Sequence, residues 1–144
     1  MKVYLDTSVL KRPFDDQSQP RIRLETEAAV TILAIAQAGG IEIINSSVLR
    51  YENSRDPDPE RRRYMERLLK LCHITQGVND IVQQRAAALE AMGLGPLDSL
   101  HVSAAEAAGA DCFLTCDDRL SRHYAGPLQI LNPVPFVLKL DQLP

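Results

Sequence analysis

The sequence predicts an α/β protein built on a mainly parallel sheet of about five strands. Short segments of strand character alternate along the chain with longer segments in which apolar residues recur every three or four positions. This alternation is typical of parallel sheets whose strands are connected by helices. The segment around Tyr4 is apolar on both faces, as a central strand of such a sheet is. We expect strands at residues 2–5, 41–44, 72–75, 111–115 and 129–131.

The segments between these strands predict helices with clear start and stop signals. Gly39 and Gly40 end the helix predicted over residues 21–38, because glycine is favoured just after a helix. Pro133 starts a terminal helix at a position where proline is tolerated. The stretch 11–20 is rich in proline and aspartate and predicts a loop whose charges are solvated or capping. Further helices are expected after residues 45–47 and over residues 59–71, 79–92, 97–108 and 118–124.

The chain is long enough for a substantial core, and we expect one domain over residues 1–144. Hydrophobic residues make up 45% and charged residues 24% of it, as in ordinary globular proteins. No signal region and no apolar run near the ~20 residues of a membrane span is seen. Three cysteines cannot all pair, which suits a reducing compartment. We therefore expect a cytoplasmic protein without membrane attachment.

Four acidic residues stand where the predicted elements reach one edge of the sheet. Asp6 and Asp117 each follow a strand, Asp98 opens a helix, and Glu52 lies in the helix after the second strand. Ligands of open α/β sheets bind outside the carboxyl ends of the strands, so the set indicates a site there. Each acid also has a structural explanation, as a helix cap for the aspartates or a solvated helix position for Glu52. Asp118 is an alternative to Asp117, since either can cap and leave the other for chemistry.

The segments that carry these acids resemble the PIN-domain nucleases over essentially the whole chain. The Thr-x-Asp spacing selects Asp117 as the fourth acid, with Asp118 as the residue that shares or replaces its role. The resemblance implies a PIN-like three-layer α/β/α sandwich, with Asp6, Glu52, Asp98 and Asp117 in the places of the family's acidic quartet. It also implies that Thr115, with Thr7 or Ser8, supports those acids. The matching segments are Val3-Tyr4-Leu5-Asp6-Thr7-Ser8, Glu52 after Ser46-Ser47, Leu97-Asp98-Ser99-Leu100-His101 and Leu114-Thr115-Cys116-Asp117.

Carboxylate oxygens are the protein ligands that Mg²⁺ prefers, so the four acids fit Mg²⁺ or Mn²⁺ as cofactor. Such ions polarise a phosphate and lower the pKa of a bound water for attack. The resemblance therefore implies a metal-dependent endoribonuclease that acts on RNA. Many bacterial PIN domains are VapC-type toxins paired with an antitoxin protein, and PIN nucleases commonly form homodimers. His101, three residues after Asp98, is expected in the core or beside an acid rather than as a ligand, because these metals favour oxygen.

The substrate-binding surface is less clearly marked. Arg61, Arg62 and Arg63 are candidates for contacts to RNA phosphates, although a solvated helix face explains the run at least as well. The net charge of −3 argues weakly against a nucleic-acid partner unless a metal neutralises several acids. Aromatic residues make up 5% of the chain, so base stacking is not indicated. The alternative function is a non-catalytic PIN-fold module that binds RNA or a protein partner, and the presence of all four acids favours the nuclease.

Overall fold

The computed structural model describes residues 1–142 and contains a five-stranded sheet in which every pair of neighbouring strands is parallel. The order across the sheet is β3-β2-β1-β4-β5. The predicted parallel sheet is therefore confirmed, and the last two residues of the expected domain lie outside the described part of the chain. The strands are β1 (Lys2–Leu5), β2 (Glu42–Ser46), β3 (Ile74–Gln76), β4 (Cys112–Leu114) and β5 (Gln129–Leu131).

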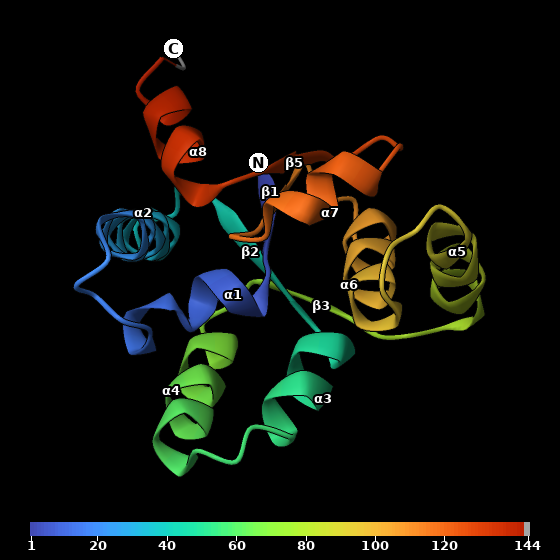
Figure 1. Ribbon diagram of the computed structural model, residues 1–144, viewed down its shortest axis with the longest axis horizontal. Helices are drawn as coiled ribbons and strands as arrows, with labels where there is room; N and C mark the ends of the chain where they lie inside the picture. The colour runs from blue at the N-terminus through green and yellow to red at the C-terminus, as the bar shows by residue number, and fades with distance from the viewer. Residues whose placement is uncertain (143–144) are drawn as a thin grey trace.

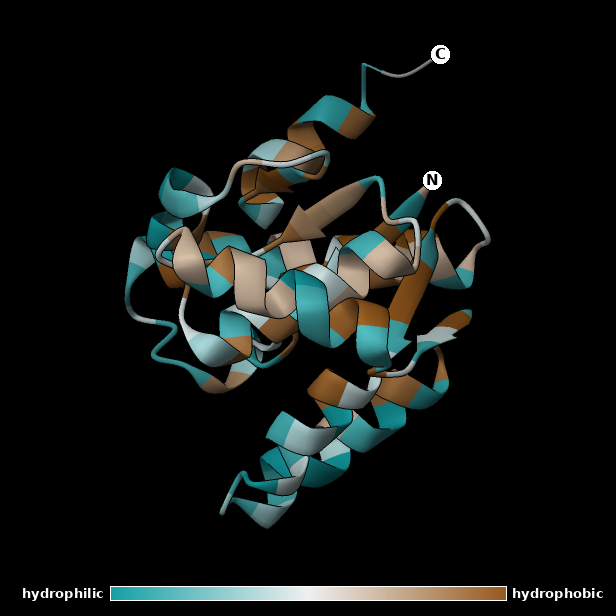
Figure 2. Cartoon of the chain, turned by 90° about the vertical axis from the view of Figure 1, so that its right-hand side faces the viewer, coloured by the Kyte–Doolittle hydropathy of each residue, from teal (hydrophilic) through white to brown (hydrophobic). Residues whose placement is uncertain are grey.

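Helices flank this sheet on both sides, as the predicted sandwich requires. One side carries α2 and α8, the other carries α5 and α6, and α3 and α4 project beyond the sheet as a pair (Figure 1). The projecting pair is mainly hydrophilic in colour (Figure 2). No helix within residues 1–142 has the length and apolar character needed to cross a membrane. The helices are α1 (Thr7–Leu10), the 3-10 helix η1 (Arg12–Phe14), α2 (Pro20–Gln37), α3 (Ser47–Ser54), α4 (Pro59–Lys70), α5 (Asp80–Ala91), α6 (Pro96–Ala107), α7 (Asp118–His123) and α8 (Pro133–Leu140).

The strand order reverses beside β1, and this reversal positions the site. Strands β2 and β3 extend the sheet to one side of β1, whereas β4 and β5 lie on its other side. In doubly wound sheets, ligands bind in the crevice at such a switch point, outside the carboxyl ends of the strands. The segments that leave β1 and β4 lie next to each other there, since the backbone N–H of Asp6 donates to the carbonyl of Leu114 at 3.0 Å.

Tyr4 anchors the middle of the sheet. Its side chain is fully buried and stacks on Phe113 of β4, with ring centroids 5.1 Å apart and 8° between the planes. Ala104 and Ala105 of α6 are also fully buried, so small side chains let this helix pack closely. Helix α6 ends before Gly109, whose φ of 74° is a left-handed conformation that glycine adopts without strain.

The charged loop after α1 differs from its prediction, because Arg12 is not solvated. Its Nε and Nη2 atoms donate to Oε1 of Glu25 at 3.0 and 2.7 Å. Glu25 is 1% exposed and also accepts hydrogen bonds from Arg21 and Asn132. Burial acts to raise the pKa of Glu25, but its donors outweigh burial and lower it. The network therefore holds a buried carboxylate that joins η1, α2 and the start of α8.

Candidate active site

Asp6 caps α1 and also lies buried at the switch point, so its capping role does not exclude a place in a site there. Its Oδ1 accepts from the backbone N–H of Thr7 at 2.9 Å. Its Oδ2 accepts from the hydroxyls of Ser8 and Thr115, each at 3.0 Å. The side chain is 8% exposed, and burial, with a contribution from Glu52, raises its pKa. The predicted hydroxyl residues on both sides of the switch point therefore hold this acid in one orientation.

Glu52 reaches the same place from α3 and is held by a buried hydrogen-bonded chain. Its Oε1 accepts from the hydroxyl of Thr7 and contacts Nε2 of His101 at 3.0 Å. The other ring nitrogen of His101 lies 2.7 Å from the hydroxyl of Tyr4, which lies 2.6 Å from that of Ser46. Burial acts to raise the pKa of Glu52, but the hydrogen bonds from His101 and Thr7 lower it. Glu52 is therefore a positioned acid and not a solvated helix residue.

Asp98 is the acid with the fewest protein contacts. It lies in the first turn of α6, whose N-cap is Gly95, so the capping explanation of Asp98 is wrong. Its carboxylate is half-buried and accepts no hydrogen bond from the part of the chain that the structure describes. Burial and the nearby charge of Asp6 raise its pKa. A half-buried carboxylate next to other acids, without a donor of its own, is suited to bind a cation.

The structure separates the two members of the acidic doublet. Asp117 caps α7 and shares a cavity of about 290 Å³ with Asp98. Its carboxylate accepts from Arg119, which lowers its pKa. Asp118 is exposed and forms a two-pronged ion pair with Arg21, with both distances 2.9 Å. Asp117 thus lies toward the other acids, whereas Asp118 joins α7 to α2 on the surface.

The donor set fits a hard divalent cation. One ligand atom each from Asp6, Glu52 and His101 lies within 4.8 Å of the other two. Both ring nitrogens of His101 already have partners, however, so this side chain orients Glu52 and is not free to bind a metal. The atoms left for a cation are carboxylate oxygens, which are the ligands of the Mg²⁺ class. The sequence indicated these acids, but it did not indicate the series of hydrogen bonds that runs through Tyr4. The only sign of that series in the sequence was a histidine three residues after Asp98.

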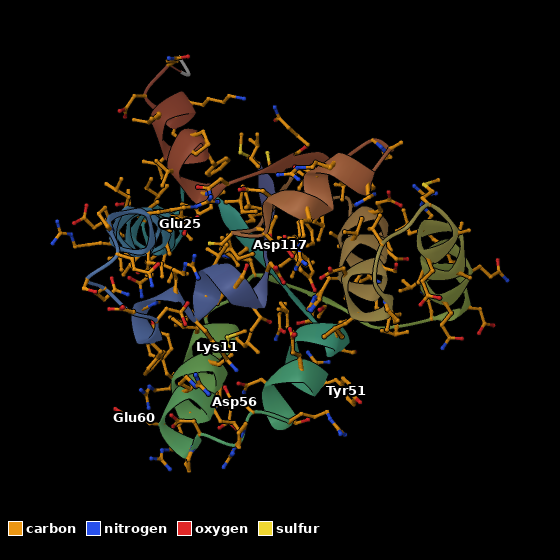
Figure 3. All side chains as sticks on the ribbon, in the orientation of Figure 1. Lys11, Glu25, Tyr51, Asp56, Glu60 and Asp117 are labelled. Carbon is orange, nitrogen blue, oxygen red and sulfur yellow. The ribbon has the colours of Figure 1, made fainter. Side chains whose placement is uncertain are left out.

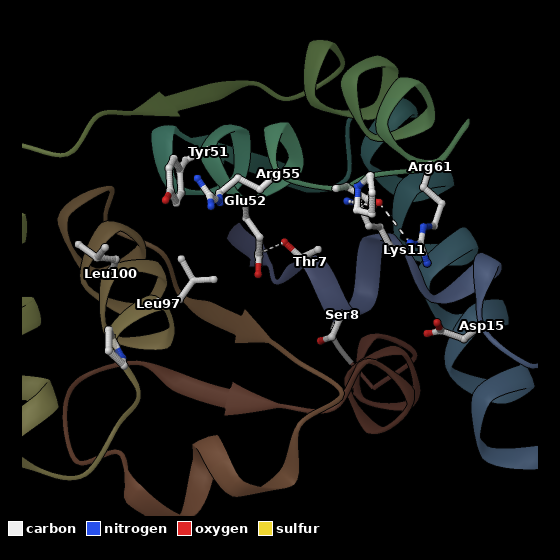
Figure 4. A pocket seen from close by; sticks show the side chains of 13 residues that line it. Thr7, Ser8, Lys11, Asp15, Tyr51, Glu52, Arg55, Arg61, Leu97 and Leu100 are labelled. Atoms are coloured by element: carbon white, nitrogen blue, oxygen red, sulfur yellow. Dashed lines mark hydrogen bonds and ion pairs between the residues drawn. The ribbon is translucent and has the colours of Figure 1, made fainter. Parts of the chain in front are cut away.

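A cavity of about 790 Å³ opens beside Glu52, between α1, α3 and the start of α6 (Figure 4). Two positively charged side chains in the cavity form ion pairs with the same acid. Nζ of Lys11 and Nη2 of Arg61 lie 2.7 and 3.2 Å from carboxylate oxygens of Asp56. Lys11 and Asp56 are labelled near each other in Figure 3. Of the predicted arginine run, Arg61 lines this cavity, whereas Arg62 donates to the carbonyl of Asp56 at 2.8 Å. The run is therefore partly structural.

The fold and the acids define a doubly wound α/β protein with a candidate carboxylate metal site at its switch point. The model of the PIN domain matches residues 3–126, and the chain belongs to this family. The resemblance noted in the sequence is confirmed. PIN domains are generally metal-dependent nucleases, so the family supports a nuclease role for the acidic cluster.

Three solved structures with the same fold have low sequence identity to this chain. VapBC2 from Rickettsia felis, bound to a DNA fragment from their promoter, is 19% identical with a TM-score of 0.62, covering 92% of this chain and 98% of that chain. FitAcB from Neisseria gonorrhoeae is 16% identical with a TM-score of 0.60, covering 91% and 97%. PAE2754 from Pyrobaculum aerophilum is 17% identical with a TM-score of 0.53, covering 99% and 91%. Among curated proteins no match is found.

Proposed function

We propose that this chain is a metal-dependent endoribonuclease that hydrolyses phosphodiester bonds with Mg²⁺ or Mn²⁺ as cofactor. Asp6, Glu52, Asp98 and Asp117 are its proposed metal ligands. The observation that carries the proposal is that atoms of Asp6 and Glu52 lie within 4.8 Å of each other, close enough to Asp98 for their charges to act on its pKa. Asp117 lines one cavity with Asp98, so acids from four separate segments lie near the switch point. A cluster of this kind repels itself without a counter-charge, which a divalent cation supplies.

The bound metal would polarise the scissile phosphate and lower the pKa of a bound water. The chain's own residues set the geometry of the ligands. Ser8 and Thr115 fix one oxygen of Asp6, and Thr7 and His101 fix Glu52. Fixed ligands lose little conformational freedom when a cation and a phosphate bind, so the arrangement favours a defined position for the reacting groups.

The test is cleavage of end-labelled RNA by the full chain with Mg²⁺ or Mn²⁺, and with EDTA as the metal-free control. Asp98→Asn is the informative variant, because no hydrogen bond within residues 1–142 depends on its carboxylate. We expect a loss of about 100-fold or more in cleavage rate, equivalent to about 2.7 kcal/mol of transition-state stabilisation.

The matched control is Asp118→Asn, which removes the same charge from the acidic doublet on the surface. Its RNA cleavage rate should stay within about 3-fold of the wild-type rate, because the change is remote from the reacting groups. Equal cleavage by wild type and Asp98→Asn would reject the site. Absence of cleavage with either metal would reject the nuclease and leave a PIN-fold module that binds RNA or a protein.

We further propose that the chain is the toxin of a toxin–antitoxin pair and acts in the cytoplasm. The fold similarity to VapBC2 and FitAcB supports this proposal. Homodimer formation stays a prediction from the family resemblance. Co-expression with the product of a small adjacent reading frame tests the pairing. We expect a stable complex in which RNA cleavage is abolished. An unchanged cleavage rate would contradict the pairing.

A further inference from the structure

The cavity beside Glu52 is lined in part by an aromatic ring that is largely exposed. Tyr51 is 55% exposed on α3 and directly precedes Glu52 in the chain. The guanidinium carbon of Arg55 lies over this ring, 5.7 Å from its centroid. Exposing a tyrosine forgoes the burial of a large apolar surface, so the ring is free to bury that surface against a ligand.

The same ring lines the cavity of about 790 Å³ (Figure 4). Leu97 and Leu100 of α6 line the cavity with it, which gives the site apolar walls next to an aromatic face. Glu52 and Thr7 line the cavity too, so the apolar part continues directly into the proposed metal site. A flat, apolar ligand bound here would therefore be connected to a group at the acids.

The positively charged side chains that line the cavity differ in whether an acidic side chain of the protein already neutralises them. Lys11 and Arg61 are neutralised by Asp56, as described above. Arg55, in contrast, forms no ion pair with any of the described residues. A guanidinium keeps its charge at all ordinary pH values, stacks on planar rings and binds phosphate in two-pronged geometry. Arg55 can thus stabilise a stacked base and contact the neighbouring phosphate.

We propose that Tyr51 and Arg55 form a nucleobase-stacking site, with the base on Tyr51 belonging to a nucleotide next to the phosphate at the acids. The proposal rests on the ribonuclease function proposed above. Bases inside a duplex stack on each other and are not free to stack on a side chain, whereas bases in loops and single strands are. Stacking on an aromatic ring tolerates every base, so the site selects strand state and not sequence.

The test measures binding, so that it is independent of cleavage. Fluorescence anisotropy of a labelled 12-nucleotide single-stranded RNA is followed in EDTA with the full-length Asp98→Asn protein as the cleavage-silent background. Within this background, Tyr51→Leu should weaken binding by about 5-fold or more, because one stacked base contributes at least that much. Tyr51→Phe keeps the ring and should stay within about 2-fold.

Three further binding measurements test the same site. Arg55→Gln should weaken binding more than Arg23→Gln, which removes an equal charge from an exposed position on α2. An RNA in which one nucleotide after another is made abasic should lose affinity at one position with Tyr51 present, and should lose nothing there in Tyr51→Leu. A fully duplexed RNA of the same sequence should bind more weakly than the single strand and should be insensitive to Tyr51→Leu.

Equal affinity of Tyr51→Leu and Tyr51→Phe for the single strand would overturn the proposal and leave this face for a protein partner. No binding of any RNA would overturn it as well. Ring-dependent binding without cleavage by the wild type would support the stacking site and reject the nuclease. Cleavage by the wild type with no effect of Tyr51→Leu on binding would support the nuclease and reject the stacking site. The two proposals can therefore fail separately.

Discussion

The replacement Asp6→Asn should stabilise the metal-free protein and weaken its response to metal. One oxygen of Asp6 and one of Glu52 lie within 4.8 Å, and at an effective dielectric constant of about 20 two charges at that separation repel by about 3.5 kcal/mol. Asparagine caps a helix as well as aspartate does, so α1 keeps its cap. The variant loses the charge-assisted part of the bonds from Ser8 and Thr115, which we put at about 2 kcal/mol together.

The difference is a gain of about 1.5 kcal/mol, which for a chain of 144 residues raises the melting temperature by about 5 °C. Thermal unfolding in EDTA measures this gain. Addition of Mn²⁺ at about 100 times its dissociation constant should stabilise the wild type by about 2.7 kcal/mol, or about 9 °C. Asp6→Asn should gain much less, because it removes one of the proposed ligands.

The control Asp141→Asn changes an exposed aspartate far from the site in the sequence and should stay within about 0.5 kcal/mol of the wild type under both conditions. The reasoning would be refuted if Asp6→Asn melted below the wild type in EDTA and both proteins responded equally to Mn²⁺. Asp6 would then be a structural cap and no metal ligand.

Three further predictions concern the surrounding networks. Glu25→Gln should lower the free energy of unfolding by about 3 kcal/mol in a urea titration, because it breaks the buried ion pair and leaves Arg12 with only its more exposed partner, Asp15. His101→Gln should lower the cleavage kcat more than it raises KM, since it disturbs a proposed ligand and touches no substrate. Asp56→Asn should lower the free energy of unfolding at neutral pH but not at pH 2. Its ion pair with Lys11 lowers the pKa of Asp56 to about 2. The stability that this pair contributes is therefore complete above about pH 4 and is lost as the pH falls toward 2.

Each of these has a direct check. Glu27→Gln, an exposed neighbour on α2, should leave the urea midpoint nearly unchanged, and an equal effect of both glutamine variants would contradict a special role of Glu25. For His101→Gln, a rise in KM with unchanged kcat would argue against positioning. For Asp56, a difference between wild type and variant that stays constant from pH 6 to pH 2 would exclude the ion pair as its cause.

Part of the site could be predicted because it is local in the chain. Asp6 directly follows an apolar strand and Asp98 opens a helix, and both positions were marked by their neighbours. The loop charges could not be predicted, because the partner of Arg12 stands on another helix and only folding makes Glu25 a buried acid. The exposed ring of Tyr51 was likewise invisible, since composition counts aromatic residues without saying which of them reach the surface of a cavity.

The sequence by itself determined the parallel sheet, the succession of strands and helices along the chain, and the four candidate acids. Strand periodicity, helix caps and strand-end positions are set by residues a few places apart. Only the tertiary structure placed Asp117 in a cavity with Asp98 and paired Asp118 with Arg21. It also joined Glu52 to His101 and Tyr4, and brought Tyr51 to the wall of the cavity beside Glu52. The physical reason is that contacts across the switch point depend on which strands pair, and β1 and β4 are more than 100 residues apart in the chain.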